Sequence, residues 1–565
     1  MTAVRRLLTI VLAASAMTLS AQTPAPTARP TDVPRETAPV TADTDKDVNN
    51  PRALKLTLGD AITTSVRQNL GVEVQQYTYL MSGQLLRESY GIFDWLGNGQ
   101  LSRTSSQSPN ISRIQATSSN STTANVGVGQ EIPTGGLYNL TWTNSRTAQT
   151  GSLNILNPSY RSGLDLQFTQ PLLRNFGVDV TRRGITVARN NLGINREAFR
   201  GTLMDTASSV EQAYLDLVYA RRYVDVVKEA VFLARDQARI TQIRIDVGAS
   251  APLDILQPRV QIGTTEGQLI TAVAGVRDAE DRLRALMNLP TADWDRPIIP
   301  TDDVTYVPVT IDTDQAVARA YQLRPELKES QLTTANRRVQ YVYARNQVLP
   351  KVDLALEYST AGLAGNALTT DPLTGQPTGL ASTGYSHALS QALGRDFPTW
   401  TVGVNVAVPI LNIAARAEAK RSELDLQQSR SLEDQTRQSI AIGVRAAARA
   451  IDTTAKEIST TRTARDAAEQ NVAAERKRYE NGLSTNFQVL QIQQQLSDAR
   501  ASELQALVGY NKAVAAYHRA VGDLLDVRGI SVEIPTINEP SLFSSWDRYN
   551  WLNYGNRVRS DGAEK

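Results

Sequence analysis

The sequence has 565 residues, with 59 Lys and Arg against 57 Asp and Glu, two histidines and no cysteine. The absence of cysteine excludes disulfides, thiolate metal sites, thiol nucleophiles and a lipidated N-terminal cysteine, and His387 and His518 are too few for a multi-histidine site. The nearly balanced charge gives no basic excess for nucleic acid. We therefore predict no metal, no cofactor and no nucleic-acid partner, in a chain long enough for more than one packing unit.

The N-terminus has the pattern of a secretory signal peptide. Two arginines precede an apolar run over residues 7–19, and a small-residue cleavage site ends at Ala21. This run is shorter than the roughly 20 residues that cross a bilayer as a helix, and no other apolar run is as long. We predict a signal peptide over residues 1–21 and a disordered linker, rich in Pro and Thr, over residues 22–51.

Four segments of the first half alternate apolar with polar or small residues, which is the period of a strand with two different faces. They cover residues 98–106, 124–132, 137–144 and 163–170. A Pro-Thr-Gly-Gly turn signal joins the middle two, so this half carries an extra hairpin. The last segment runs into Pro171-Leu172-Leu173, where proline ends ladder pairing, and a long helix is predicted after it.

The second half repeats this pattern. Strands are predicted over residues 352–358 and 400–408, and the latter runs into Pro409-Ile410-Leu411 before another long helix. Residues 360–395, rich in Gly, Thr, Ser and Ala, are expected to form a long loop between these strands. Helical segments precede the strands in both halves. We therefore divide the chain into three further parts: a first helix-strand-helix repeat over residues 52–300, a second over residues 301–525, and a C-terminal tail over residues 526–565.

The two long helices, over residues 181–247 and 414–481, contain no proline. About 66 residues at 1.5 Å each give rods of about 100 Å, well beyond an ordinary globular helix. Apolar residues recur at heptad spacing, which is typical of coiled-coil seams. In the first helix these are Leu203, Ala207, Val210, Tyr214, Leu217, Val224 and Val231, and in the second Ile440, Val444, Ala447, Ile451 and Ile458.

Each long helix ends in the same motif, Arg-x3-Gly-x-Ser-x3-(Asp/Gln)-(Ile/Val)-Leu-Gln, which starts at Arg244 and again at Arg478. Glycine suits the left-handed position that ends a helix, and serine can cap the helix that follows. Each motif therefore predicts the tight tip of a helical hairpin. The glycines and serines concerned are Gly248, Ser250, Gly482 and Ser484.

Four to six strands per chain cannot close a transmembrane barrel, for which about eight is the minimum, and lipid does not tolerate an open sheet edge. Closure must come from other copies of the chain, and two strands per repeat from three copies would give about twelve. Five aromatic residues could form interfacial girdles or pack within the sheet, with neither reading favoured: Tyr138, Trp142, Phe168, Tyr358 and Trp400. The sequence thus predicts a homo-oligomeric tube.

From about residue 54 to 525 the chain resembles the TolC-like outer-membrane efflux proteins. The resemblance rests on the duplication, the two strand-Pro-Leu/Ile-Leu junctions, the two Arg-x3-Gly-x-Ser tips and Val348-Leu349-Pro350 before a strand. It implies an α+β membrane protein with internal duplication, whose long coiled-coil helices form a trimeric periplasmic α-barrel continuous with a shared outer-membrane β-barrel. It also implies a duct that opens when an inner-membrane transporter and a periplasmic adaptor engage its tips.

The resemblance also assigns candidate site residues. Gly248, Ser250, Gly482 and Ser484 fall on the tip positions that meet the adaptor, and Asp254 on the polar position near the constriction of the pore. Gln488 and Gln491 stand where well-known members carry acidic residues, which puts an electronegative entrance ring in doubt. Gln257, at the matching position of the first tip, completes the predicted constriction. Alternatively, Asp254 pairs with Arg244 or Arg478.

We predict an exit duct in the outer membrane of a Gram-negative bacterium, with a long periplasmic portion, that serves a tripartite efflux pump or a type I secretion system. Its predicted partners are a homotrimer of itself, an adaptor, a transporter and outer-membrane lipid. An enzyme is disfavoured, because no residue set has nucleophile-base or metal-ligand spacing. The competing class is a periplasm-spanning coiled-coil scaffold or adhesin that conducts nothing. The cargo is left open.

Overall fold

The computed structural model describes residues 50–109, 116–150, 155–370, 373, 377–531 and 534–538. All of them belong to a single unit, Asp43–Lys565. The predicted signal peptide, nearly all of the predicted linker and most of the predicted C-terminal tail, including its aromatic residues, lie outside the described residues.

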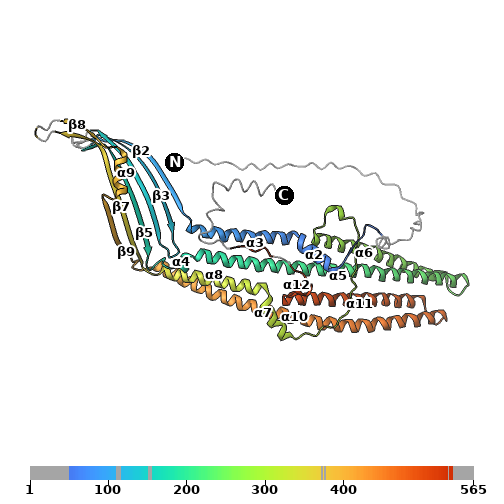
Figure 1. The fold of residues 1–565 in the computed structure, drawn as a ribbon. Helices are drawn as coiled ribbons and strands as arrows, with labels where there is room; N and C mark the ends of the chain where they lie inside the picture. The colour runs from blue at the N-terminus through green and yellow to red at the C-terminus, as the bar shows by residue number, and fades with distance from the viewer. Residues whose placement is uncertain are drawn as a thin grey trace, which may run out of the picture. The chain divides into compact units, whose positions relative to one another are not determined.

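Two helices of more than sixty residues organise the helical part. α5 spans Arg183–Asp246 and α10 spans Ile413–Glu480, with 64 and 68 residues. Each turns back into a shorter antiparallel helix, α6 over Leu256–Met287 and α11 over Asn486–Val521. The two hairpins run side by side (Figure 1). Both long helices predicted from the sequence are confirmed, with ends shifted by no more than two residues.

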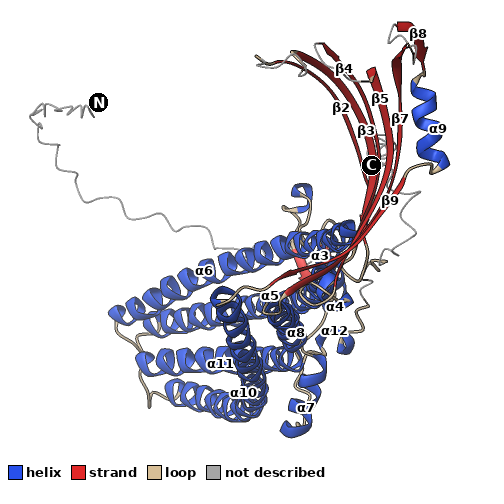
Figure 2. Cartoon of the chain, turned by 90° about the vertical axis from the view of Figure 1, so that its left-hand side faces the viewer, coloured by secondary structure: helices blue, strands red, loops and turns tan. Residues whose placement is uncertain are grey.

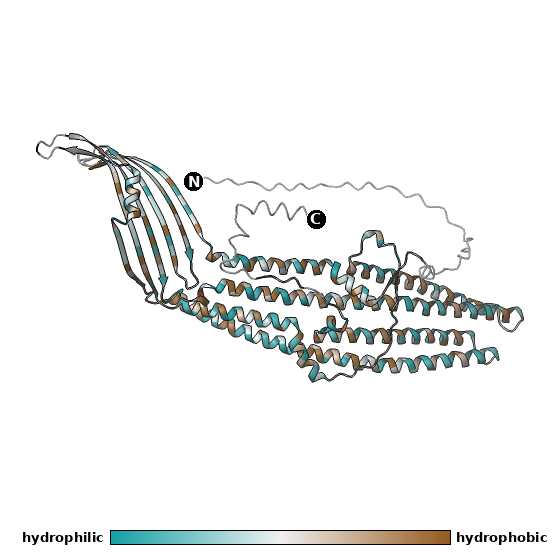
Figure 3. Cartoon of the chain, viewed as in Figure 1, coloured by the Kyte–Doolittle hydropathy of each residue, from teal (hydrophilic) through white to brown (hydrophobic). Residues whose placement is uncertain are grey.

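The heptad positions form the seams between these helices, because apolar residues three or four apart share one helix face. On α5 every predicted seam residue is buried: Leu203, Ala207, Val210, Tyr214, Leu217, Val224 and Val231. On α10, Ile440, Val444, Ile451 and Ile458 are buried and Ala447 is half-buried. Hydrophilic and hydrophobic residues alternate along the helices (Figure 3). The predicted seams are therefore confirmed.

The helices that precede the strands are each broken in two. α2 (Leu58–Gln68) and α3 (Leu70–Ser89) form the first pair, and α7 (Thr313–Leu323) and α8 (Pro325–Gln347) form the second. The Asn69 side chain accepts hydrogen bonds from the N–H groups of the first turn of α3, which restarts that helix. In the second pair a proline begins α8, and the residue before a proline avoids helical geometry. The predicted helical segments are confirmed, each with a break that the sequence pattern had not indicated.

The short strands β1 (Leu54–Leu56) and β6 (Ile298–Pro300) pair in parallel beside the helices. The other strands form one antiparallel sheet in the order β2-β3-β4-β5-β7-β8, and β9 also pairs with β7. β9 pairs with residues 351–360 of β7 and β8 with residues 366–370, so the sheet is six strand positions wide. Their bounds are Leu96–Gln107 (β2), Ser118–Glu131 (β3), Leu137–Thr150 (β4), Leu156–Pro171 (β5), Lys351–Thr370 (β7), Pro377–Ser382 (β8) and Pro398–Ala407 (β9).

All six predicted strands exist, and most are longer than predicted. The extra hairpin of the first half is part of the sheet, because β3 and β4 pair with each other through the predicted turn, and with β2 and β5 on either side. Gly135 in that turn has φ +87°, a left-handed conformation that glycine adopts without a side-chain clash.

The sheet has an apolar and a polar face, as its period of two predicts. By the strand register the apolar face carries Val126, Val128, Leu140, Leu164, Leu166, Leu354, Leu356, Val402, Val404 and Val406, and the five aromatic residues singled out in the sequence. The polar face carries Asn125, Asn139, Thr141, Thr143, Asp165, Gln167, Glu357, Ser359, Thr401 and Asn405. Whether the aromatic residues form an interfacial girdle stays a prediction.

The long loop expected over residues 360–395 is wrong. β7 continues to Thr370, β8 follows, and a helix, α9, spans Tyr385–Gly394 before β9 begins. α9 packs on the apolar face of β7 and β5, where Ala388 and Ala392 are buried and the Tyr385 hydroxyl donates a hydrogen bond to Asn144 (Figure 2). Gly362 permits this approach, since a Cβ there would lie 1.8 Å from the Ala388 carbonyl oxygen. The small residues that suggested a loop serve close packing.

Among the described residues, no helix is both long and apolar enough to cross a membrane.

Candidate functional site

The first tip joins α5 to α6 through a tight turn at Gly248. This glycine has φ +76°, and the turn is closed by hydrogen bonds from its N–H to the Ile245 carbonyl at 2.9 Å and from the Ala249 N–H to the Arg244 carbonyl at 2.7 Å. These bonds satisfy carbonyl groups left open at the end of α5, the pattern of a Schellman motif.

The second tip repeats this geometry between α10 and α11. Gly482 has φ +75°, its N–H donates to the Tyr479 carbonyl at 3.0 Å, and the Leu483 N–H donates to the Arg478 carbonyl at 2.8 Å. No heavy atom outside the immediate chain neighbours lies within 4 Å of where a Cβ would stand on either glycine. The predicted left-handed glycines are confirmed at both tips, and backbone conformation rather than lack of space requires them.

The predicted capping role of the two serines is wrong. In the second tip Thr485 is the N-cap of α11, accepting a hydrogen bond from the Gln488 N–H at 3.3 Å, while the Ser484 hydroxyl donates to Glu475. In the first tip a 3-10 turn, Pro252–Ile255, lies between Ser250 and α6. The helices start later than the motif suggested, so a different residue caps each of them.

Neither predicted arginine pairs with Asp254 in the structure. The Asp254 carboxylate accepts a hydrogen bond from the Ala251 N–H at 3.0 Å, within its own turn. Arg244 reaches across to the second hairpin, where its Nη1 donates to the Tyr479 carbonyl at 2.7 Å and its guanidinium lies 4.7 Å from the centre of the Tyr479 ring. Arg478 forms an ion pair with Glu475 at 3.2 Å. The arginines hold helix ends in place.

A buried polar cluster joins the two hairpins just behind the tips. Asn486, at the start of α11, accepts a hydrogen bond from Gln237 Nε2 at 2.8 Å and donates one to the Asp254 carbonyl at 3.3 Å. Thr241 donates to the Gln237 carbonyl at 2.8 Å and also lies 3.4 Å from the Asn486 side chain. All three polar side chains are buried. The motif comparison missed this cluster, because Gln237 and Thr241 precede the repeated motif.

The predicted constriction residues are exposed on the first turns after the tips. Asp254 and Gln257 lie at the start of the α6 hairpin arm, and Gln488 and Gln491 lie on α11. Exposed side chains at matching positions of both hairpins are available to a shared opening, but their lining of a pore stays a prediction.

Large apolar side chains surround the tip glycines, and the sequence reading did not single them out. Val247 and Leu253 at the first tip are 72% and 74% exposed, and Leu483 and Phe487 at the second are 71% and 58% exposed. We call these four residues the tip patch. Exposed apolar side chains grouped at one end of a molecule are typical of an interaction surface. Their presence on both sides of each glycine was the available signal.

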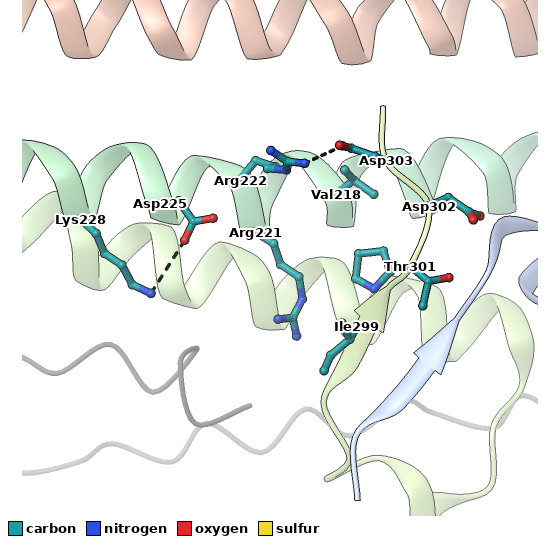
Figure 4. Close-up of a pocket in the computed structure, with 10 residues that line it drawn as sticks. Val218, Arg221, Arg222, Asp225, Lys228, Ile299, Thr301, Asp302 and Asp303 are labelled. Atoms are coloured by element: carbon teal, nitrogen blue, oxygen red, sulfur yellow. Dashed lines mark hydrogen bonds and ion pairs between the residues drawn. The ribbon is translucent and has the colours of Figure 1, made fainter. Parts of the chain in front are cut away.

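A cavity lies away from the tips, between α5 and the segment that follows β6 (Figure 4). Its charges are compensated: Arg222 pairs with Asp303 at 2.6 Å, Lys228 with Asp225 at 3.9 Å, and Arg221 with the buried Glu280 at 2.8 Å. These pairs bind the crossing segment to the helices, which is a structural role. The described residues contain no cluster of three or more His, Cys, Asp or Glu able to hold a metal ion.

Comparison with known proteins gives the class. Residues 137–289 and 316–523 match the model of the outer membrane efflux protein family. The outer membrane efflux protein BepC of Brucella suis is 24% identical over 306 residues, which are 52% of this chain and 59% of BepC. The alignment therefore spans less than two thirds of that relative.

Solved structures share the fold. The CmeC outer membrane channel of Campylobacter jejuni superposes with a TM-score of 0.59 at 15% identity, covering 86% of this chain and 88% of CmeC. VceC of Vibrio cholerae gives a TM-score of 0.59 at 13% identity, covering 85% of this chain and 98% of VceC.

Duplicated helical hairpins and an antiparallel half-barrel sheet with one apolar face define a TolC-like channel of the outer membrane, whose helical portion lies in the periplasm. The two matched segments cover more than half of the sequence, and the chain belongs to the outer membrane efflux protein family. This is a family of channels rather than enzymes. TolC-like channels are trimeric and work with efflux machinery.

Proposed function

We propose that three copies of this chain form the outer-membrane exit duct of a tripartite efflux pump, conducting substrates from the periplasm or an inner-membrane transporter to the exterior. The observation that carries the proposal is the sheet. One of its faces is apolar over β3, β4, β5, β7 and β9, and β2 and β8–β9 leave its two edges without strand partners within the described chain. Open edges are not tolerated in lipid, so neighbouring copies are the natural partners.

The width of the sheet defines the barrel that such a trimer would form. Three copies of six strand positions would close eighteen strands rather than the twelve expected from two strands per repeat. Barrels of 16 to 18 strands leave an aqueous channel. The polar face, with its Asn, Thr, Gln and Ser side chains, would line that channel, and the apolar face would contact lipid.

The tips are the proposed contact with the periplasmic adaptor, and through it with the inner-membrane transporter. Gly248, Ser250, Gly482 and Ser484 form the turns, and the tip patch supplies apolar surface beside them. Apolar anchors surrounded by polar groups are typical of protein interfaces. Opening would require the hairpins to separate around the pore axis, working against the buried cluster of Gln237, Thr241 and Asn486.

Asp254, Gln257, Gln488 and Gln491 are proposed to line the closed end. One carboxylate per protomer gives a ring of three, which favours cations. The Asp254→Asn substitution tests this without disturbing the turn, because an asparagine oxygen can still accept the hydrogen bond from the Ala251 N–H.

The test is to purify the mature protein in detergent, measure its oligomeric mass and record single-channel currents in planar bilayers. A trimer that conducts, with cation selectivity lowered by Asp254→Asn, supports both the duct and the constriction. A conducting trimer whose selectivity Asp254→Asn leaves unchanged keeps the duct and removes Asp254 from the pore. A detergent-independent monomer that never conducts overturns the proposal in favour of a structural scaffold.

A further inference from the structure

Charged side chains are divided unequally between the two faces of the sheet. By the register, the polar face carries every acidic residue of the described strands, together with Lys351 and Arg161: Glu131, Asp165, Asp353 and Glu357. On the apolar face of the described strands the charged residues are two arginines, Arg103 on β2 and Arg146 on β4. Both arginines are exposed. This asymmetry requires a reason, because charge is costly on a face that meets lipid.

The two arginines lie in one row across the sheet. Arg103 is opposite Thr122, Thr122 is opposite Arg146, and Arg146 is opposite Tyr160. Neighbouring strands are about 4.8 Å apart, so the backbones at Arg103 and Arg146 are separated by roughly 10 Å. Long arginine side chains can converge on one ligand across that distance.

The row lies just beyond the apolar band. It continues through Tyr160 to Ala364 on β7, whereas the apolar band on β7 begins at Val352, next to the helices. The ten residues from Val352 to Gly362 extend about 33 Å along a strand, or about 25 Å along the axis of a barrel with strands tilted by about 40°. That is the height of the apolar band of outer-membrane barrels. Arg103 and Arg146 therefore lie at the far boundary of the bilayer from the helices.

Helix α9 occupies the same level. Tyr385 bonds to Asn144, two residues before Arg146 on β4, and the side of α9 away from the sheet exposes Ser386, His387 and Ser390. Polar side chains directed away from the barrel indicate that the lipid at this level is no longer hydrocarbon. Because the helical portion is periplasmic, this boundary is the headgroup layer of the outer leaflet.

We propose that Arg103 and Arg146 bind the phosphate groups of the phosphorylated glycolipid that forms this leaflet. Guanidinium groups bind phosphate oxygens through two parallel charge-assisted hydrogen bonds. The occupant is a lipid rather than a soluble anion, because both arginines project from the face that contacts acyl chains. The inference rests on the outer-membrane placement of the sheet and extends the proposed function by a lipid site.

The test measures glycolipid retained by the full-length protein after extraction from outer membranes in a mild detergent, using native mass spectrometry. We expect the Arg103→Gln, Arg146→Gln double variant to retain about tenfold less glycolipid per trimer, because two charge-assisted contacts are lost. The matched control is Arg161→Gln, which removes an exposed arginine from the polar face of β5, opposite Ser145 and next to Arg146 along the sheet. It should retain the normal amount, and a double Arg→Lys variant should keep most of it.

Equal retention by the double Gln variant and the Arg161→Gln control would overturn the inference. So would full displacement of the lipid by millimolar inorganic phosphate, which would indicate a soluble-anion site. Single-channel conductance of the same preparations shows whether the barrel has assembled. Lost lipid with normal conductance supports the site, whereas absence of conductance in every preparation, wild type included, counts against the channel and not against the arginines.

Discussion

The two repeats are alike at their tips and different at their strands. At the tips, Gly248 and Gly482 have φ values of +76° and +75°, and the same two hydrogen bonds close both turns. At the other end the first repeat contributes four strands with an inserted hairpin, while the second contributes β7 and β9 with β8 and α9 inserted between them. One half of the design was kept after duplication, and the other was extended in two separate ways.

The difference follows from what each end must satisfy. A tip turn has to reverse a helix within a few residues, and the left-handed residue and its two bonds are a narrow solution. A sheet accepts insertions more readily, because an added hairpin pairs its own backbone and extends the face on which it lies. The four predictions below test whether the tips are equivalent and whether the sheet depends on its two faces, from the largest expected effect to the smallest.

The largest effect is expected from a charge on the apolar face of the second repeat. Val404 on β9 is 58% exposed in the protomer, and in the barrel its surroundings become lipid. A lysine at the bilayer midplane costs about 2–4 kcal/mol, and a trimer pays this three times. Val404→Lys should strongly reduce the amount of folded trimer in outer-membrane fractions, measured by gel mobility before and after heating.

The neighbouring residue provides the control for this substitution. Asn405 lies on the polar face of the same strand, opposite Asp353. Asn405→Lys should leave trimer assembly unchanged and alter only ion conduction. If both variants assembled equally well, the assignment of the two faces to lipid and channel would be wrong.

The second prediction concerns the buried cluster behind the tips. Asn486→Ala removes the acceptor for Gln237 Nε2, and a buried donor left without a partner costs about 1–3 kcal/mol. The hairpins of one protomer should then separate more readily, which should raise single-channel conductance and lower the melting temperature. Asn481→Ala is the control, because the exposed Asn481 side chain bonds only to the Lys477 carbonyl of its own helix among the printed contacts of the described chain. Equal conductance in the two variants would contradict a role of the cluster in holding the tips closed.

Much of this architecture could be predicted from the sequence, because it depends on local periodicity. Heptad residues such as Leu217 and Ile451 mark the seams, and alternation marks the strands. What could not be predicted depends on contacts between distant segments. The Gln237 to Asn486 bond joins residues 249 apart, and small residues such as Gly362 and Ala388 looked like a loop when read alone. The capping serines were misjudged because one residue of offset decides which side chain reaches the helix.

The third prediction compares the two tips directly. Gly248→Ala and Gly482→Ala each place a side chain on a left-handed residue with open space around it, so the cost is backbone strain of about 1 kcal/mol in both cases. We expect equal small losses of thermal stability and restoration by Gly→Asn, since asparagine tolerates this conformation. Efflux measured in cells then separates the tips. A larger loss of efflux from one Ala variant, at equal stability, would show that the adaptor contacts the two tips differently.

The smallest effect is a pH dependence in the second repeat. Burial raises the pKa of Glu329 on α8 from its ordinary 4.5 to about 7, and repulsion from Glu326 and Glu197 adds to this. A carboxyl whose pKa is higher in the folded state stabilises the protein below its unfolded pKa, and this contribution is lost as the pH rises through about 7. The melting temperature of the trimer should therefore fall from pH 5 to pH 8, and Glu329→Gln should reduce that fall.

The neighbouring Glu326 supplies the control for this titration, because its pKa is shifted the opposite way. Burial acts to raise the pKa of Glu326, but a hydrogen bond from its own backbone N–H and the charges of Arg324 and Arg519 outweigh burial and lower it. Its stabilising contribution is lost only as the pH falls through that lowered pKa, below the 4.5 of an ordinary glutamate, so Glu326 stays ionised in both folded and unfolded chains from pH 5 to pH 8. Glu326→Gln should then lower the melting temperature by the same amount at every pH in this range. A pH slope unaffected by Glu329→Gln, or one changed equally by both variants, would assign the titration to groups elsewhere in the trimer.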